Sequence, residues 1–153
     1  SMHDFDRLLL LASLHDIGKL GVPDSIVNKP GSLTKEEYQI MQTHCEIGYQ
    51  LAMSIAGLSS VSEEILSHHE RWDVNGYPNG ISGMQIPLLS QIIAVVDTYD
   101  VITHNRVYKK AQTHEYALSE LRRCSGGQFS PEVVELFLGI FDQLSDDDLH
   151  YFT

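Results

Sequence analysis

Histidine and aspartate side chains that can bind a metal ion recur along the 153-residue sequence, each beside apolar residues: His15, Asp16, His44, His68, His69 and Asp97. Because desolvating a carboxylate costs several kcal/mol, an aspartate in an apolar segment calls for a partner or a metal ion. Asp97, which follows the apolar run at 92–96, is therefore the most informative of the set. Taken alone, it could instead bond a helix terminus or a core histidine.

Each histidine, taken alone, could also have an ordinary structural role instead of binding a metal ion. His44 could be a core or surface residue of a helix. Neighbouring side chains on a helix point about 100° apart, so one of His68 and His69 could face solvent. Only the combination of these residues indicates a site.

Together the six side chains supply four imidazoles and two carboxylates, which suit iron, manganese or zinc better than calcium or magnesium. Two such ions can hold a bridging hydroxide, because coordination lowers the pKa of water from about 15.7 towards 7, and they can clamp a phosphate for in-line attack. Asp16 is the natural bridge, since a carboxylate has two oxygens whereas an imidazole offers a metal one lone pair. Such a binuclear centre needs no serine or cysteine nucleophile.

The elements that must position these side chains are predicted to be helices. Apolar residues at helical spacing predict helices over 5–17, 34–57, 62–70, 88–102, 113–124 and 130–141. Thr34 and Glu37 have the form of a capping box. The run at 88–102 could also be a strand, although its length favours a helix, and residues 71–87 are expected to form an ordered functional loop. We therefore expect an all-α fold, a compact bundle of about five to seven helices.

Composition limits the class of protein. The length and the 42% share of hydrophobic residues are typical of one domain, and the net charge of −11 argues against a nucleic-acid polymer as partner. Two cysteines, Cys45 and Cys124, are too few for a disulfide framework, so we interpret both as reduced thiols of a cytoplasmic protein. The longest apolar run, 8–12, is far shorter than the roughly 20 residues of a membrane span.

Several motifs, in their order along the chain, resemble one known family. Residues 15–19 read His-Asp-Ile-Gly-Lys and resemble the signature of the HD phosphohydrolase superfamily, and residues 68–78 resemble the second signature of its HD-GYP subfamily. Further matches are Asn28-Lys29-Pro30-Gly31, His44-x-Glu46-Ile47-Gly48, Asp97-x-x-Asp100 with Arg106-x-Tyr108, and Gln128-Phe129-x-Pro131. The resemblance covers residues 8–138 and implies a helical HD-type domain with an ordered GYP loop.

This resemblance implies a metal-dependent phosphodiesterase that hydrolyses the bacterial second messenger cyclic di-GMP to pGpG, and in some members to GMP, with a metal-bridging hydroxide. One metal ion would be held by the counterparts of His15, Asp16 and Asp97, and the other by those of Asp16, His44, His68 and His69. Iron or manganese is expected, with zinc, nickel, cobalt or magnesium as alternatives. A regulatory domain upstream and a signalling protein partner are further expectations.

Four residues are expected to contact the substrate. Lys19 corresponds to the family lysine that contacts the substrate phosphate, and we expect it to be catalytic together with Asp16; its alternative is an ordinary cation at a helix C-terminus. Tyr77 of the GYP loop would shape the guanine side or the partner side of the site, or would simply pack. Arg106 and Lys110 could reach a phosphate or a base, or could be solvated surface.

The sequence departs from the family pattern in three places. Cys45 stands where the family has proline, and Val74-Asn75 stand where it has Gly-Ser. The family has an upstream helix with a further ligand, most of which we expect to be missing, so a third metal ion is not expected. Residues 1–2 are interpreted as a cloning scar, 3–143 as the HD-GYP domain and 144–153 as a tail or short helix.

These departures keep two other functions open. One is a catalytically weak signalling module that binds a cyclic dinucleotide or a protein through the GYP loop. The other is an HD hydrolase of a different nucleotide, such as cyclic GMP-AMP, because base choice depends on a few pocket contacts.

Overall fold

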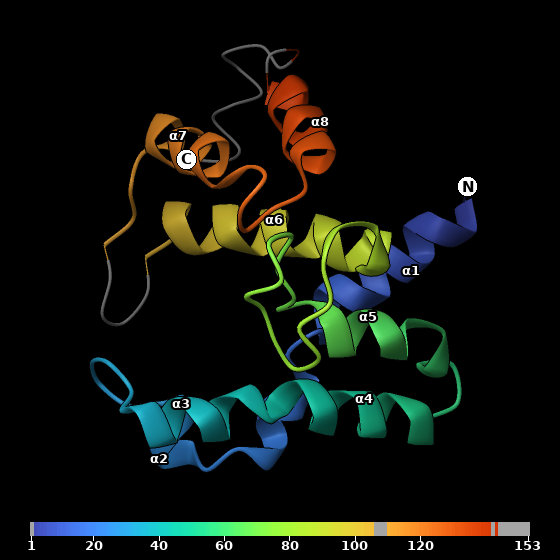
Figure 1. Ribbon diagram of the computed structural model, residues 1–153. Coiled ribbons are helices and arrows are strands. Elements are labelled where there is room, and N and C mark those ends of the chain that lie inside the picture. The colour runs from blue at the N-terminus through green and yellow to red at the C-terminus, as the bar shows by residue number, and fades with distance from the viewer. Residues whose placement is uncertain (1, 106–109, 142, 144–153) are drawn as a thin grey trace.

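The computed structural model describes residues 2–105, 110–141 and 143, which form helices and connecting loops (Figure 1). Seven α-helices of the described range have six residues or more: α1 Met2–Leu14, α3 Lys35–Gln42, α4 His44–Ser54, α5 Ser62–Ser67, α6 Leu88–Thr103, α7 His114–Cys124 and α8 Pro131–Phe141. The short elements are α2 Asp24–Val27 and the 3-10 helices η1 Ile17–Gly21, η2 Ser59–Val61 and η3 Gly83–Gln85. The predicted all-α fold is confirmed. Ser1 of the expected scar, Arg106 and the tail expected at 144–153 lie outside the described residues.

Helix α6 crosses the middle of the molecule, with α7 and α8 on one side and α4 and α5 on the other (Figure 1). It contributes to two hydrophobic cores. Val95, Tyr99 and Ile102 pack with apolar residues of α7 and α8. Ile93 packs with Leu11 of α1 and with apolar residues of α4 and α5. The helical interpretation of 88–102 is thus confirmed, and burial on several sides explains why this helix reads as almost continuously apolar.

Helix α4 ends at Ser54 instead of near 57, and three further helix boundaries that differ from the prediction lie at a histidine. Helix α1 ends at Leu14 instead of near 17, the segment 34–57 divides into α3 and α4 at Thr43, and α5 ends at Ser67 instead of 70. In each case the imidazole that follows takes a backbone carbonyl three residues earlier. A side chain that competes for helix carbonyls favours a helix end. Apolar periodicity carries no signal of this competition.

Two helix starts have threonine caps. The predicted capping box is present, because the Thr34 hydroxyl accepts from the Glu37 backbone N–H while the Glu37 carboxylate accepts from the Thr34 N–H. Thr113 accepts from the Tyr116 N–H in the same way at the start of α7. These bonds satisfy backbone donors that a helix start leaves without partners.

Hydrogen bonds to Glu70 and to residues 127–128 hold the loop at 71–87, in agreement with the predicted ordered loop. One oxygen of the buried Glu70 carboxylate accepts from the backbone N–H groups of Asn79 and Gly80, at 2.7 and 3.1 Å. Gly76 crosses the start of the loop so closely that a Cβ there would lie 2.3 Å from a backbone nitrogen. Only glycine permits this approach.

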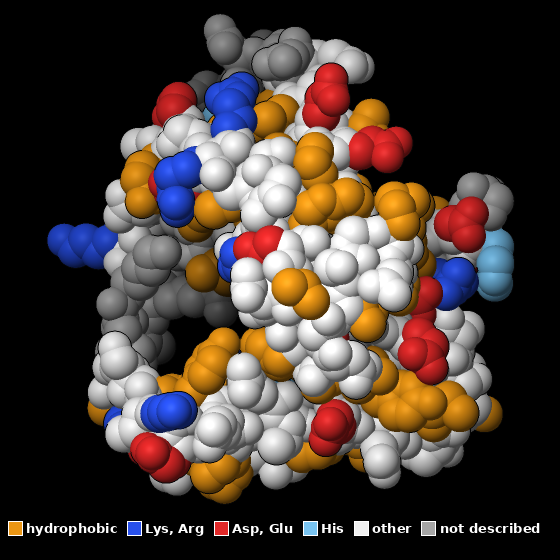
Figure 2. All heavy atoms as spheres, in the orientation of Figure 1, with side chains coloured by type: hydrophobic (Ala, Val, Ile, Leu, Met, Phe, Trp, Pro, Cys, Tyr) orange, Lys and Arg blue, Asp and Glu red, His pale blue; other side chains and the backbone are white. Residues whose placement is uncertain are grey.

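The surface gives no long-range attraction to anions. On the face shown in Figure 2, lysine and arginine side chains are scattered singly among acidic and apolar ones. The net charge is −11, so an anionic ligand must be attracted by charges inside a site, where screening by salt is weaker. None of the helices in the described ranges is both long and apolar enough to cross a membrane.

Candidate metal centre and cleft

Four of the predicted ligands meet in one cluster. Asp16, His44, His68 and His69 each offer a ligand atom, and these atoms all lie within 4.8 Å of one another. The His44 and His68 Nε2 atoms are 3.2 Å apart. Two nitrogens that bind one ion at about 2.1 Å lie about 3.0–3.4 Å apart in octahedral or tetrahedral geometry. The cluster could therefore hold a metal ion.

Three of the histidines are oriented by the same local device. The Nδ1–H groups of His15, His44 and His68 donate to backbone carbonyls three residues earlier, at 3.1, 2.7 and 2.6 Å. Since a carbonyl only accepts, the proton must be on Nδ1, which leaves Nε2 with a free lone pair. Metal-binding histidines usually have their other nitrogen fixed in this manner. The three helix boundaries at a histidine are thus also the places where a backbone carbonyl orients an imidazole toward the cluster.

Asp16 lies between two groups of histidines. Its Oδ1 is 3.5 Å from His44 Nε2 and 3.9 Å from His68 Nε2, whereas its Oδ2 is 3.7 Å from His15 Nε2. The Lys19 ammonium donates to Oδ2 at 2.6 Å. Oδ1 is buried and has no hydrogen-bond partner among the described residues. A buried, unpaired carboxylate oxygen costs free energy, so this atom fits a cation as its missing partner.

Close packing of η1 against α4 places Asp16 next to His44. A Cβ on Gly18 would lie 2.5 Å from the backbone nitrogen of Gly48. The two glycines allow the backbones of the two segments to touch. The glycine of the His-Asp-Ile-Gly-Lys motif therefore contributes to the site by allowing η1 to pack closely against α4.

Burial favours the neutral form of His44, His68 and His69. It lowers the pKa of His44, lowers that of His68 well below the ordinary value, and lowers that of His69 to about 4; the adjacent imidazoles add to the shift of the last two. Neutral imidazole is the form that binds metal. For Asp16, burial acts to raise the pKa, but the Lys19 hydrogen bond and charge act against it and the pKa is lowered overall.

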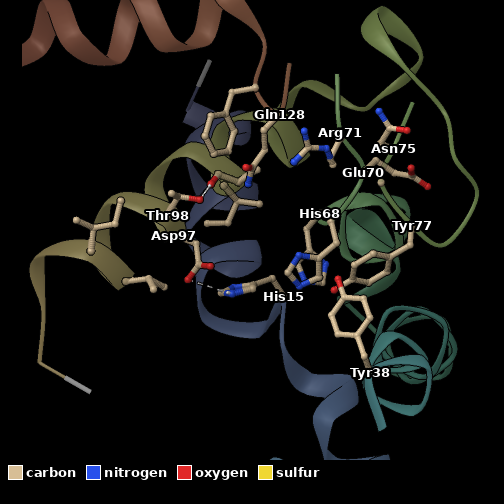
Figure 3. Close-up of a pocket in the computed structure, with 17 residues that line it drawn as sticks. His15, Tyr38, His68, Glu70, Arg71, Asn75, Tyr77, Asp97, Thr98 and Gln128 are labelled. Carbon is tan, nitrogen blue, oxygen red and sulfur yellow. Dashed lines mark hydrogen bonds and ion pairs between the residues drawn. The ribbon is translucent and has the colours of Figure 1, made fainter. Parts of the chain in front are cut away.

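The sixth predicted ligand, Asp97, lies on the other side of His15. Its Oδ1 is 3.9 Å from His15 Nε2, and Figure 3 shows the two side chains facing each other. The apolar run before Asp97 does not bury it, since 38% of its side chain is exposed. Asp97 occupies the side of α6 that faces a cleft, which explains why a residue within an apolar segment is partly exposed.

Cys45 is buried beside the cluster, with Sγ 3.7 Å from His44 Nε2. Burial and the nearby carboxylates raise the pKa of its thiol to about 12. It stays protonated near neutral pH and is a poor metal ligand or nucleophile. This environment makes Cys45 a chemically inert thiol.

The cluster opens into a cleft of about 590 Å³ (Figure 3). Tyr77, a predicted substrate contact, lines the cleft and stacks on His69, with the ring centroids 4.9 Å apart. Lys110 is exposed and is not among the residues that line the cleft. Sequence reasoning assigned no role to three residues that do line it: Tyr38, Arg71 and Gln128. Arg71 and Gln128 belong to motifs that resemble the family, and this was the signal in the sequence that could have identified them.

Fold and site together define an all-helical protein with a candidate metal centre made of histidine and aspartate side chains. Residues 5–133 match the model of the HD domain family. A curated "Cyclic di-GMP phosphodiesterase" of Thermotoga maritima is 45% identical over 137 residues, which are 88% of this chain and 37% of the relative. The "3'3'-cGAMP-specific phosphodiesterase 2" of Vibrio cholerae is 41% identical over 90% of this chain and 27% of the relative.

The chain belongs to the HD domain family, and within it to the HD-GYP type. A crystal structure of a Vibrio cholerae cyclic GMP-AMP specific phosphodiesterase matches with a TM-score of 0.71 over 94% of this chain and 39% of that chain. Its identity of 23% makes this a likeness of fold. The chain spans about a third of the length of the curated relatives, at 37%, 30% and 27% for three of them.

Proposed function

We propose that the chain is a metal-dependent phosphodiesterase domain that hydrolyses cyclic di-GMP. The observation that carries the proposal is the position of Asp16, whose Oδ1 faces His44 and His68 while its Oδ2 faces His15. A carboxylate with each oxygen toward a different set of donors is suited to two ions. The names of the relatives support a cyclic dinucleotide as substrate.

Two divalent ions, iron or manganese, are proposed for this centre. His15, Asp16 and Asp97 would hold one, and Asp16, His44, His68 and His69 the other. Such ions supply Lewis acidity that activates water near neutral pH and neutralises phosphate charge. The donor set of imidazoles and carboxylates fits iron and manganese, with zinc, nickel, cobalt or magnesium as alternatives.

Lys19 is the proposed catalytic cation of the protein itself. Its ammonium lies 2.6 Å from Asp16 Oδ2 and 37% of its side chain is exposed, so it reaches the site and also solvent. A fixed positive charge beside a reacting phosphate stabilises the charge that develops in the transition state. Lys19 would thus bind and orient the scissile phosphate while it keeps Asp16 ionised.

The remaining residues orient the reacting groups. The carbonyls that bond Nδ1 of His15, His44 and His68 hold the imidazoles with Nε2 toward the centre. Tyr77 covers His69 on its cleft side and restricts its rotation. A site whose side chains are fixed beforehand reorganises less during the reaction.

Cyclic GMP-AMP is the second candidate substrate, because one relative is named for it at 41% identity. A binding module without turnover is not favoured. All six predicted ligands lie in or beside the same cleft, and neither Cys45 nor Val74 replaces one of them.

Elemental analysis of protein purified without oxygen, followed by hydrolysis assays with added Mn²⁺ or Fe²⁺, tests the proposal. Cyclic di-GMP and bis(p-nitrophenyl) phosphate, a simple phosphodiester, would be assayed side by side. We expect close to two metal ions per chain and turnover of both compounds. Binding of cyclic di-GMP without turnover in any metal would contradict the proposal and favour the module.

A further inference from the structure

Two polar side chains with unused hydrogen-bonding groups line the cleft away from the metal-capable cluster. They are those of Arg71 and Gln128 (Figure 3). Within the described part of the chain, neither Nη1 of Arg71 nor the side-chain amide of Gln128 has a hydrogen-bond partner. In Figure 3, His68 lies between this pair and Tyr38.

Asp73 fixes the plane of the Arg71 guanidinium. Nε donates to one carboxylate oxygen at 3.0 Å and Nη2 to the other at 2.7 Å, and 34% of the arginine side chain is exposed. This bidentate pair uses one edge of the guanidinium and leaves Nη1 for another acceptor. Because the plane is already fixed, binding at Nη1 loses little side-chain entropy.

Two backbone hydrogen bonds join the segments that carry the pair. Trp72 N–H donates to the Gln128 carbonyl at 3.1 Å, and Asp73 N–H donates to the Gly127 carbonyl at 2.9 Å. The segments are far apart in sequence but are neighbours in the fold. The arginine and the amide therefore have a fixed relative position.

The position also suits a part of the substrate other than the scissile phosphate. Arg71 follows His69 by two residues, so their Cα atoms lie within about 7 Å. A long side chain from this point can reach a group one sugar away from a phosphate at the cluster. In a cyclic dinucleotide that group is a base or the other phosphate.

We propose that Arg71, with Gln128 beside it, recognises the O6 and N7 edge of a guanine and so determines specificity for guanine over adenine. This inference rests on the proposed function for the placement of the phosphate. Guanine presents two acceptors on this edge, whereas adenine presents one acceptor and one donor. An arginine side chain has hydrogen-bond donors only, so it can pair with both acceptors of guanine but leaves the adenine amino group unpaired.

Binding of cyclic di-GMP and cyclic di-AMP to the metal-loaded chain, by calorimetry, tests the inference without any need for turnover. Wild type should bind cyclic di-GMP more tightly. In Arg71→Met the affinity for cyclic di-GMP should fall between about 5-fold and 150-fold, the range for one lost bidentate base contact. Its affinity for cyclic di-AMP should change much less, so the discrimination should largely disappear.

Arg123→Met is the matched control. Arg123 makes the same pairing through Nε and Nη2, with Glu120, but on an exposed side of α7 away from the cleft. It should leave both affinities unchanged. Arg71→Lys keeps the charge without the planar donor group, and it should lose discrimination as Arg71→Met does.

Four results would overturn the inference. Equal losses for both dinucleotides, or full recovery with Arg71→Lys, would mean that Arg71 contacts a phosphate as a point charge. If Arg71→Met loses affinity for neither dinucleotide, Arg71 only stabilises the loop. If the wild type binds neither dinucleotide, the cleft has no guanine site. Hydrolysis of bis(p-nitrophenyl) phosphate by the wild type reports on the proposed function separately, since that compound has no base, and the control Arg123→Met should hydrolyse it at the wild-type rate.

Discussion

The backbone at Gly18 lies directly against the carbonyl group of His44: a Cβ on Gly18 would be 1.8 Å from the carbonyl oxygen. Asp16 is two residues before this contact and His44 is part of it. Any side chain at 18 must therefore separate the two elements that bring these groups together.

Gly18→Ala should destabilise the protein and weaken metal binding together. Overpacking costs about 1–3 kcal/mol, and the upper end is expected because the obstacle is backbone. Urea denaturation and metal analysis would measure the two effects. Gly139→Ala, where no atom of the described residues lies within 4 Å of the added Cβ, should cost nothing; equal effects of the two substitutions would refute this role of Gly18.

Asp16→Ala should abolish both metal retention and phosphodiesterase activity, because it removes the carboxylate shared by the two proposed sites. Elemental analysis and turnover of cyclic di-GMP are the measurements. Asp6→Ala, which alters an exposed aspartate of α1, provides the control and should behave as wild type. An Asp16→Ala protein with two metals and full turnover would rule out the assignment.

Lys19→Met should separate metal binding from catalysis. Removing the cation beside Asp16 Oδ2 takes a positive charge away from the site, so metal should be held as tightly as in wild type or more so. Turnover should fall by about 100-fold, as when a single group that stabilises the transition state is lost. Loss of metal from this variant would instead assign Lys19 to the structure of the site.

The metal-free protein should lose stability as the pH falls from about 6.5, the ordinary histidine value, to about 4, the lowered pKa of His69. In this window the unfolded chain binds protons that the imidazoles of His44, His68 and His69 in the folded protein do not, so the free energy of unfolding decreases. Urea denaturation in EDTA at several pH values would show it. His69→Gln removes one of the three groups, so an unchanged pH dependence in that variant would contradict the expected cause.

Val74→Gly should stabilise the protein. Val74 has a φ of 70°, in the left-handed region, and its side chain is 54% exposed, so little packing is lost. Left-handed backbone costs a residue with a Cβ about 1–2 kcal/mol, from which the greater entropy loss of glycine subtracts about 0.5–1 kcal/mol. The urea midpoint should therefore rise modestly. Val74→Ala retains the Cβ and should gain less; a lower midpoint for Val74→Gly would show that the strain is absent.

The sequence by itself determined the all-α class, the helix at 88–102, the capping box at Thr34 and the six metal-capable side chains. These follow from apolar periodicity and from residue type, which are local properties. It did not determine where α1, α3 and α5 end, because those boundaries depend on imidazoles that take helix carbonyls and on the packing that holds them there.

Only the tertiary structure decided which groups meet. The contact of Gly18 with His44 and the backbone hydrogen bonds of Trp72 and Asp73 to residues 127–128 join segments that are distant in the chain. The burial of Asp16 Oδ1 and the exposure of Asp97 also depend on how the helices pack. Spacing along a sequence constrains neighbours within one element. Distances between elements are set by the packing of their side chains and backbones, and the chemistry of this cleft depends on those distances.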